Sequence, residues 1–303
     1  MECNLCGSNE FELQFKGTID INKLDRFSQY SLYGDLYRCT SCGFVTQKLE
    51  HSVDEILALL KQEKYLDEAI GDLNIEEKGV QFRKLISLMK KSCELNGASL
   101  LDVGANTGVF LQEFTNYSEN VQGIEPSEEA AATAKRLFGH QVENAVIADA
   151  HLDDGKFDII TMWDVIEHLY DPRNDLETLF SKLKPGGVIF ITTHDVSDWF
   201  ARVMGKNYPA YMYQHFFHFS HKTLTLMLEN AGFRVVNLTR FCKSWSFGYL
   251  HEMLYKIWPE SRLVSIVRGL MKPLLMIPGA AKLQISVPIY NFFLIAAQRP
   301  LDK

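Results

Sequence analysis

The residues best suited to chemistry in this chain are an acid and two glycines at the end of a buried apolar run. Asp102 lies within the run Leu100-Leu101-Asp102-Val103, and Gly104 and Gly108 come after it. About twenty residues later, a second short apolar run ends at Glu125. A strand, a glycine turn and a helix, followed by an acid at the tip of the next strand, is the layout of a nucleoside-binding α/β site.

The spacing of these residues selects among nucleoside ligands. Gly104-x-x-x-Gly108 differs from the G-x-G-x-x-G of dinucleotide sites, and no Lys-Ser or Lys-Thr pair follows, which excludes a P-loop. Asp102 would repel a pyrophosphate, whereas it suits a ligand that carries an ammonium and a sulfonium group. The sequence therefore predicts that S-adenosylmethionine binds here and that the protein is a methyltransferase.

The composition is that of a globular protein with a sizeable core. Of 303 residues, 47% are hydrophobic and 23% are charged, and the net charge is −7, so we expect no binding to nucleic acid. The first residues lack the basic start and apolar core of a signal peptide, and no apolar run is long enough to span a bilayer. We therefore expect a cytoplasmic protein with reduced thiols. The sequence leaves the oligomeric state open.

Four cysteines form two C-x-x-C-G motifs near the start of the chain, Cys3 with Cys6 and Cys39 with Cys42. Two such motifs can place four thiolates around one metal ion, a donor set that favours tetrahedral zinc. Free cysteines or a redox pair are the alternatives, but redox motifs come singly and near a βαβ unit. We predict a structural Zn2+ site in a ribbon over residues 1–48.

From Leu100 onward, strand-like segments alternate with helical ones, which predicts a doubly wound, Rossmann-like α/β sheet over residues 99–303. Capping boxes at Ser52 and Asn74 predict two helices in a linker over residues 49–98, the second ending at Asn96-Gly97. The predicted strands are Ser99–Val103, Val121–Glu125, Val142–Ala148, Phe157–Met162, Val188–Thr193, Phe233–Arg240 and Ile289–Ala297. The predicted helices include Ser127–Phe138, Asp175–Leu183 and Ser220–Ala231.

Several short motifs occur in the order that one known family shows. They are Leu101-Asp102-Val103-Gly104-Ala105-Asn106-Thr107-Gly108, Gly123-Ile124-Glu125-Pro126, Phe157-Asp158-Ile159-Ile160, Asp164-Val165-Ile166-Glu167-His168-Leu169, Leu183-Lys184-Pro185-Gly186-Gly187 and Leu228-Glu229-Asn230-Ala231-Gly232-Phe233. Together they resemble class I S-adenosylmethionine-dependent methyltransferases of the small-molecule type, which include ubiquinone-biosynthesis O-methyltransferases. The cysteine motifs ahead of such a core further resemble sugar C-methyltransferases, although the long C-terminal domain usual in those is missing. The resemblance implies a seven-stranded sheet whose last strand is antiparallel.

The resemblance also assigns roles to residues that match the family's motifs. It implies that Asp102 and the glycine turn hold the methionine part of the cofactor. Glu125 lies where the two ribose hydroxyls need an acceptor, and Asp149 follows the third predicted strand, where the family places a side chain against the adenine amine. The residues expected to contact the cofactor are Asp102, Gly104, Ala105, Asn106, Thr107, Gly108, Glu125, Pro126, Asp149, Ala150, Trp163 and Asp164.

Two histidines are candidates for the base that an oxygen or carbon acceptor needs. His168 belongs to Asp164-x-x-Glu167-His168, and some quinone O-methyltransferases use a similar group with a divalent cation, so the resemblance implies Mg2+ here. His215 precedes the helix predicted at Ser220, and members of this family often have a histidine at that place. The alternative for His168 is a buried imidazole that pairs with Glu167 to fix a loop. We predict that His215 or His168 is the base or binds the acceptor.

The stretch from about residue 245 to 287 exceeds what a minimal methyltransferase needs. Over residues 261–284 its charges are all basic, namely Arg262, Arg268, Lys272 and Lys282. A basic amphipathic helix can lie on an anionic surface such as that of the inner membrane, while the interspersed charges and prolines argue against a spanning helix. The alternative is a helical cap that packs on the core or on a second subunit.

The leading hypothesis is methyl transfer to an O or C atom of a small molecule, namely a sugar, a glycan or a lipid-linked intermediate. A nicotinamide-dependent oxidoreductase would need the missing glycine motif. A non-catalytic binding module on a degenerate scaffold is a second alternative, against which the intact Asp102, Gly104 and Glu125 argue. Methylation of a macromolecule is a third, although the Asn/Asp-Pro-Pro-Tyr/Phe motif of amino-methylating enzymes is absent after the fourth predicted strand.

Overall fold

The computed structural model describes residues 1–19, 32–48, 72–258 and 261–301. None of the helices in this part of the chain combines the length and hydropathy that a bilayer crossing requires. The helix predicted to begin at Ser52 lies outside the described residues.

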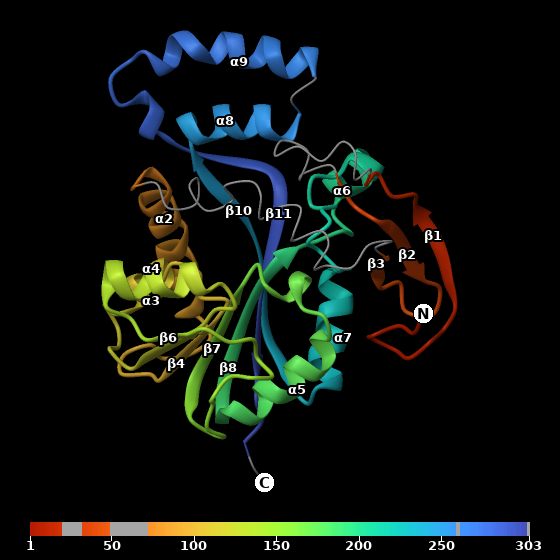
Figure 1. Ribbon diagram of the computed structural model, residues 1–303, viewed down its shortest axis with the longest axis vertical. Coiled ribbons are helices and arrows are strands. Elements are labelled where there is room, and N and C mark those ends of the chain that lie inside the picture. Colours follow the sequence, from red (N-terminus) through yellow and green to blue (C-terminus); the bar gives the residue numbers. More distant parts are fainter. Residues whose placement is uncertain (20–31, 49–71, 259–260, 302–303) are drawn as a thin grey trace.

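A seven-stranded sheet forms the centre of the molecule (Figure 1). Its strands are β4 (Leu100–Val103), β5 (Val121–Ile124), β6 (Val142–Glu143), β7 (Phe157–Trp163), β8 (Leu183–His194), β10 (Arg234–Ser246) and β11 (Gln284–Gln298). They lie in the order β10-β11-β8-β7-β4-β5-β6. Strand β11 is antiparallel to both neighbours, and the remaining pairs are parallel. The predicted α/β sheet with an antiparallel last strand is confirmed.

Several helices of the described residues cover the two faces of this sheet, and the last two extend beyond it. They are α2 (Asp72–Met89), α3 (Val109–Phe114), α4 (Glu128–Phe138), α5 (Pro172–Lys182), α6 (Trp199–Met204), α7 (His221–Asn230), α8 (Phe247–Ile257) and α9 (Arg262–Leu275). Successive residues of a strand point to opposite faces. In β4, Leu101 and Val103 therefore join an apolar cluster with α5 and α7, whereas Leu100 joins another with α2 and α3.

Local signals placed several helix starts correctly. Helix α4 begins after Ser127, whose side chain accepts the N–H of Ala130, and α7 begins after Ser220, which caps the N–H of Thr223. Helix α5 begins earlier than predicted, because Asp171 caps it and a proline occupies its first position. Helix α2 ends at Met89, and a series of turns, rather than more helix, leads to β4.

The predicted strand Val142–Ala148 was mostly wrong, since β6 contains only Val142 and Glu143. Immediately after it, the side-chain amide of Asn144 donates to the carbonyls of Glu125 (3.0 Å) and Pro126 (2.9 Å). These bonds turn the chain across the end of β5 and out of the sheet.

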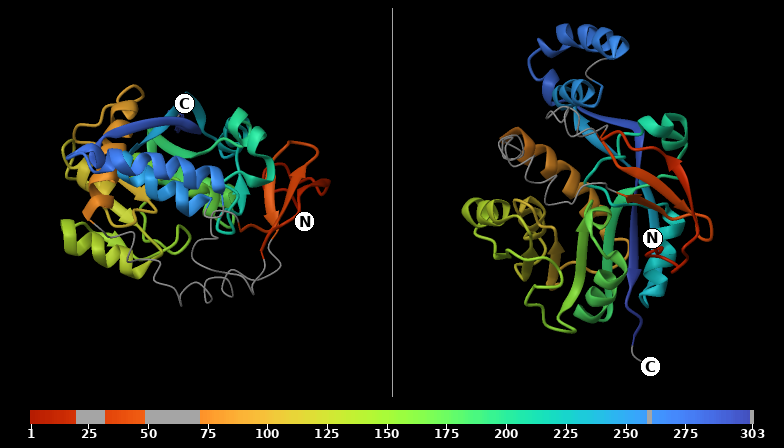
Figure 2. Two further views of the ribbon diagram at one scale, coloured as in Figure 1. Left: turned by 90° about the horizontal axis from the view of Figure 1, so that it is seen from above. Right: turned by 45° about the vertical axis from the view of Figure 1, so that its right-hand side comes forward.

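A second, four-stranded sheet joins the start of the chain to its C-terminal half (Figure 2). It contains β1 (Phe11–Phe15), β2 (Asp35–Cys39), β3 (Val45–Lys48) and β9 (Phe217–His218), in that order. The partner of β3 is β9, with Val45 opposite His218 and Thr46 opposite Phe217. The cysteine-bearing sheet therefore includes a strand that begins two residues after His215.

The helical insertion precedes the last strand. Strand β10 runs directly into α8, and α9 follows before the chain returns through β11. In Figure 1 and in the right view of Figure 2, the α8–α9 pair projects beyond the sheet, with α9 outermost. Because β10 is parallel to β8, the pair lies at the end of the sheet where the parallel strands finish.

Candidate functional site

The turn between β4 and α3 needs its two glycines. Gly104 and Gly108 have φ values of 71° and 78°, which favour glycine. A Cβ atom on Gly104 would lie 2.5 Å from Cγ2 of Val165, and one on Gly108 would lie 2.9 Å from Cβ of Ala134. Asn106, between them, also has a positive φ of 48°. The sequence folds here into a tight turn whose backbone is open to a ligand.

Glu125 holds this turn from the neighbouring strand. Its side chain is buried, and its two oxygens accept the N–H groups of Asn106 and Ser127, each at 2.9 Å. A carboxylate oxygen keeps a second lone pair after one such bond. The carboxylate can therefore accept ribose hydroxyls while it holds the turn.

A cavity of about 470 Å³ opens at the carboxyl ends of β4, β5 and β7. Its volume is in the range of small-molecule sites, and its place is where open α/β sheets bind ligands. The structure brings most of the predicted cofactor residues together around it, whereas Gly108 packs against α4 behind it. The predicted residues that line it are Asp102, Gly104, Ala105, Asn106, Thr107, Glu125, Pro126, Trp163 and Asp164.

Asp102 is buried in the wall of this cavity. The hydroxyl of Thr161 donates to its Oδ1 at 2.7 Å. Burial raises the pKa of Asp102 to about 8, a hydrogen bond from Thr161 opposes that rise, and the charge of Glu125 adds to it. A cationic ligand would supply the positive charge that favours the ionised form of this carboxyl group.

This raised pKa predicts a pH-dependent affinity for S-adenosylhomocysteine, the demethylated cofactor. Below pH 8 the free protein holds a proton on Asp102, which must leave when the ligand's ammonium group binds. We expect affinity to rise about 50-fold between pH 6 and pH 8, with proton release. Isothermal titration in buffers of different ionisation enthalpy measures both quantities. Asp102→Asn should bind weakly with little pH dependence; an unchanged pH profile in that variant would contradict the assignment.

Asp149 and Ala150, which were predicted to lie against the adenine, line neither the first cavity nor the apolar cavity next to it. Because β6 ends at Glu143, Asp149 lies beyond the sheet edge and is exposed, and Ala150 packs on the core. Ala145, Val146, Ile147 and Ala148 line an apolar cavity of about 580 Å³ that shares Gly104, Pro126, Val165 and His168 with the first one.

Sequence reasoning missed one wall of the first cavity, which one face of α2 supplies. The residues concerned are Glu77, Lys78, Gln81, Phe82 and Leu85. Their spacing of three and four residues marks a single helix face. Burial lowers the pKa of Lys78, and the nearby Glu125 opposes that effect. The predicted linker therefore covers the cofactor cavity.

Lys243 on β10 was also missed, because no motif surrounds it. Its ammonium group forms an ion pair with Asp164 and lies 3.8 Å from the centre of the Phe292 ring. Asp164 has a positive φ of 55° and accepts the hydroxyl of Thr192 at 2.9 Å. Burial would raise the pKa of Asp164, but Lys243 holds it below its usual value. The strained backbone of Asp164 thus holds its carboxylate in an ion pair with Lys243 within the lining of the first cavity.

A third cavity, of about 220 Å³, adjoins the first and is largely apolar. The two share Asp164, Lys243, Trp245 and Tyr249. Helix α8 contributes one apolar wall, and Glu167, His194 and His215 form a polar group within the lining. The remaining apolar residues of the lining are Pro209, Ala210, Met212, Leu250, Met253, Leu254, Ile257, Trp258 and Phe292.

Backbone carbonyls orient two imidazoles here, that of His215 in this polar group and that of the nearby His168. Nδ1 of His215 is 2.7 Å from the carbonyl oxygen of Ala210, and Nδ1 of His168 is 2.9 Å from that of Gln214. A carbonyl only accepts, so each Nδ1 carries a hydrogen, and a neutral His215 ring has its lone pair on Nε2. Burial is the largest of the effects that hold the pKa of His215 well below its usual value. His215 is therefore a neutral imidazole that can accept a proton.

Glu167 lies between these imidazoles. Both of its oxygens are buried and lack a hydrogen-bond partner within the described residues, and Nδ1 of His194 is 3.6 Å from Oε1. Ligand atoms of Glu167, His168 and His215 lie within 4.8 Å of one another. Although burial opposes it, the surrounding histidines lower the pKa of Glu167. A carboxylate placed in this way would stabilise an imidazolium formed on proton transfer.

The Mg2+ expected at Asp164, Glu167 and His168 does not fit this arrangement. Magnesium prefers an octahedral shell of oxygen atoms, whereas the cluster offers two imidazoles and one carboxylate. Asp164 is engaged by Lys243 instead.

Gln47 on β3 fixes the loop that carries His215. Its side-chain amide donates to the carbonyls of Met212, Tyr213 and His215 at 3.2, 3.1 and 3.0 Å, and its Oε1 accepts the N–H of Gly34 at 2.7 Å. The ribbon thus positions the loop through a buried amide.

We predict that Gln47→Leu lowers kcat about tenfold or more, because it removes the side-chain amide that donates to the carbonyls of the loop and so loosens the loop. Affinity for S-adenosylhomocysteine should remain within about threefold, since Gln47 lies outside the cofactor cavity. Steady-state kinetics and titration calorimetry separate the two effects. Equal losses in both quantities would instead indicate general unfolding.

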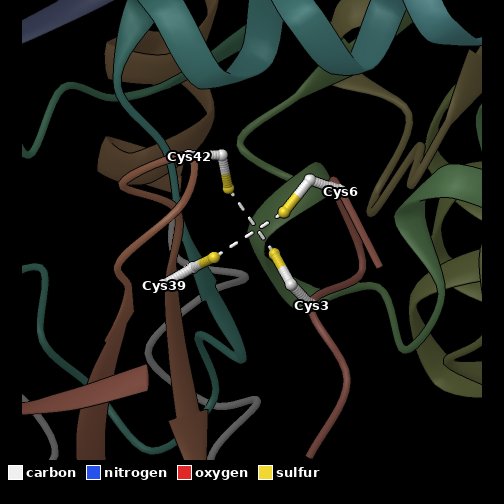
Figure 3. Close-up of side chains that lie close together, drawn as sticks. All are labelled: Cys3, Cys6, Cys39 and Cys42. Carbon is white, nitrogen blue, oxygen red and sulfur yellow. Dashed lines mark hydrogen bonds between the residues drawn. The ribbon is translucent and has the colours of Figure 1, made fainter. Parts of the chain in front are cut away.

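The four predicted cysteines converge on one point (Figure 3). The Sγ atoms of Cys3 and Cys42 are 3.6 Å apart, as are those of Cys6 and Cys39. Zn–S bonds of 2.3 Å at tetrahedral angles place sulfurs about 3.8 Å apart, so the geometry fits zinc. Although burial opposes it, the backbone N–H groups of Cys42 and Ser41 lower the pKa of Cys39 to about 7, which favours a thiolate.

We predict that Cys39→Ser removes bound zinc and lowers the Tm by about 10 °C, because three ligands do not close a structural site. Metal analysis of the purified protein should find one equivalent of zinc before the change and little after it. Cys93→Ser is the matched control, because this half-buried thiol lies outside the cluster. Full zinc content in Cys39→Ser would show that the cysteines do not hold the metal.

The sheet order, the antiparallel last strand and the acid at the tip of β5 define a Rossmann-like, nucleoside-binding α/β protein. Comparison of the sequence with family models shows which family within this class the chain belongs to. The chain belongs to the methyltransferase domain family, whose model matches residues 47–238.

Known relatives and structures agree with this family. A ubiquinone biosynthesis O-methyltransferase from Paraburkholderia xenovorans is 27% identical over 138 residues, which cover 42% of this chain and 58% of that protein. One from an Azoarcus strain is 28% identical and covers 56% and 75%. The chain spans about half the length of the first curated relatives it matches. A crystal structure of a candidate methyltransferase from Bacillus halodurans shares the fold, with a TM-score of 0.52 and 20% identity over 72% of this chain and 99% of that one.

Proposed function

We propose that this protein transfers the methyl group of S-adenosylmethionine to an oxygen or carbon atom of a small acceptor that has an apolar part. The observation that carries this proposal is the pair of adjoining cavities that share Asp164 and Lys243. One has the acid and glycine turn suited to the cofactor. The other is apolar and contains a neutral histidine beside a buried carboxylate.

The arrangement supports an in-line displacement. A lone pair of the acceptor oxygen forms the new O–CH3 bond while the S–CH3 electron pair returns to sulfur, which leaves S-adenosylhomocysteine. The acceptor proton passes to Nε2 of His215, and Glu167 stabilises the resulting imidazolium. Holding both reactants in adjoining cavities supplies the proximity that such a reaction needs. For a carbon acceptor, the same base would remove the proton from the methylated carbon.

The lining of the third cavity favours a lipid-linked acceptor over a free sugar or glycan. Free sugars need many hydrogen-bond partners, whereas the walls here are mostly aliphatic and aromatic. The names of the relatives, ubiquinone biosynthesis O-methyltransferases, support an oxygen atom as the acceptor. We propose that the zinc ribbon stabilises the fold and, through Gln47, positions His215.

Labelled transfer to a fractionated cell extract tests this proposal. Purified protein and methyl-labelled S-adenosylmethionine are incubated with lipid, glycan, small-molecule and macromolecular fractions, and Glu125→Ala serves as the inactive control. We expect label in the lipid fraction only. Label in the water-soluble or macromolecular fractions would overturn the acceptor class, and absence of label from every fraction would contradict methyl transfer.

A further inference from the structure

Helix α9 presents an apolar stripe to solvent. Leu263, Ile266, Leu270 and Leu274 are 71%, 61%, 71% and 51% exposed, and their spacing places them on one side of the helix. The other side packs on α8, where Met271 is buried. Apolar residues therefore occupy both sides of α9, although only one side faces the protein.

The turn after α9 extends this surface. Met276, Ile277 and Leu283 are 84%, 55% and 63% exposed. Contiguous exposed apolar residues of this size mark an interaction site in a soluble fold. We call residues 262–283 the α9 surface.

The charges of the α9 surface have one sign. Arg262, Arg268, Lys272 and Lys282 are its charged residues, in a chain whose net charge is −7. Arg268 pairs with Glu252 on α8 at 3.6 Å, and Lys282 pairs with Glu76 on α2 at 3.6 Å. Arg262 and Lys272 are exposed at either end of the helix.

The single sign of these charges distinguishes between two possible binding partners of the α9 surface, a second copy of this chain and a lipid bilayer. A two-fold contact between copies would place the same patch on itself, so basic groups would face basic groups. A bilayer that contains anionic lipids offers acyl chains to the stripe and negative headgroups to the flanking cations. Helix α9 is also the outermost element at its end of the molecule (Figures 1 and 2).

We propose that the α9 surface docks on an anionic lipid bilayer, with α9 lying in the plane of the interface. Helix α8 separates α9 from the third cavity and lines that cavity with its opposite side. Docking therefore places the proposed acceptor cavity one helix away from the lipid. The docking itself does not depend on the identity of the acceptor.

Sedimentation of the full-length protein with vesicles tests the proposal. The vesicles contain either phosphatidylcholine alone or phosphatidylcholine with phosphatidylglycerol. We expect binding only to the anionic vesicles and a loss of binding as salt is raised. Arg262→Gln with Lys272→Gln should weaken binding about 30-fold, and Leu263→Ser with Leu270→Ser about tenfold or more.

The matched control is Val203→Ser with Leu226→Ser, which removes exposed apolar side chains elsewhere on the surface and should not change vesicle binding. Thermal melts of each variant check that the fold is retained. Equal binding to neutral vesicles, or no binding to either kind, would overturn the proposal. A dimer in light scattering that Leu263→Ser with Leu270→Ser dissociates would identify a second copy as the occupant instead.

Discussion

Replacing His215 with asparagine should lower kcat by about 10²- to 10⁴-fold, the contribution expected of a general base. The asparagine amide can still donate to the carbonyl of Ala210, as Nδ1 does in the native protein, so the loop should keep its shape. Only the lone pair on Nε2 is lost. Single-turnover methyl transfer to the identified acceptor measures the effect.

Two control measurements distinguish a loss of the catalytic base from a loss of folding in His215→Asn. Affinity for S-adenosylhomocysteine should stay within about threefold, because His215 lines the third cavity and not the first. His218→Asn is the matched control, since His218 is equally buried on the neighbouring strand and lines none of the three cavities. If His215→Asn retained native kcat, another group would have to take the proton.

Replacing Glu125 with alanine should weaken S-adenosylhomocysteine binding by about 100- to 1,000-fold. The change removes an acceptor for two ribose hydroxyls, and it leaves the N–H groups of Asn106 and Ser127 without their buried partner. Hydrogen bonds to a charged group contribute about 1.5–3 kcal/mol each, so two bonds near the lower end of that interval, about 3–4 kcal/mol together, give this range. Titration calorimetry measures the loss.

Glu125→Gln provides an intermediate case, because the amide keeps one oxygen acceptor and should bind better than alanine. Glu128→Ala is the control, since this exposed acid belongs to the neighbouring helix α4 and contacts no part of the cavity. Native affinity in Glu125→Ala would refute the assignment of the first cavity to the nucleoside.

The parts of the site that the sequence revealed are those that local rules determine. Gly104 and Gly108 mark a turn because their backbone angles exclude other residues, and Glu125 follows from the distance between consecutive strand tips. The spacing within each C-x-x-C-G motif likewise suffices to place two thiolates on one metal ion. Each signal lies within a short segment, and the fold only brings the segments together.

The parts that were missed depend on contacts between distant segments. Lys243 and Gln47 belong to no motif. Lys243 acquires its role from Asp164, which is 79 residues away in the sequence, and Gln47 acquires its role from carbonyls around His215 that are at least 165 residues away. The strand prediction for Val142–Ala148 failed for a similar reason. Hydrogen bonds from Asn144 to the end of β5 stop β6 early, and β-propensity alone does not contain that information.

The most direct test of the central claim is a titration of the purified protein with S-adenosylhomocysteine and, separately, with NAD+. The cavity formed by Asp102, the glycine turn and Glu125 should bind one equivalent of S-adenosylhomocysteine and no NAD+. Binding of NAD+ without S-adenosylhomocysteine would contradict the assignment of this protein as a methyltransferase.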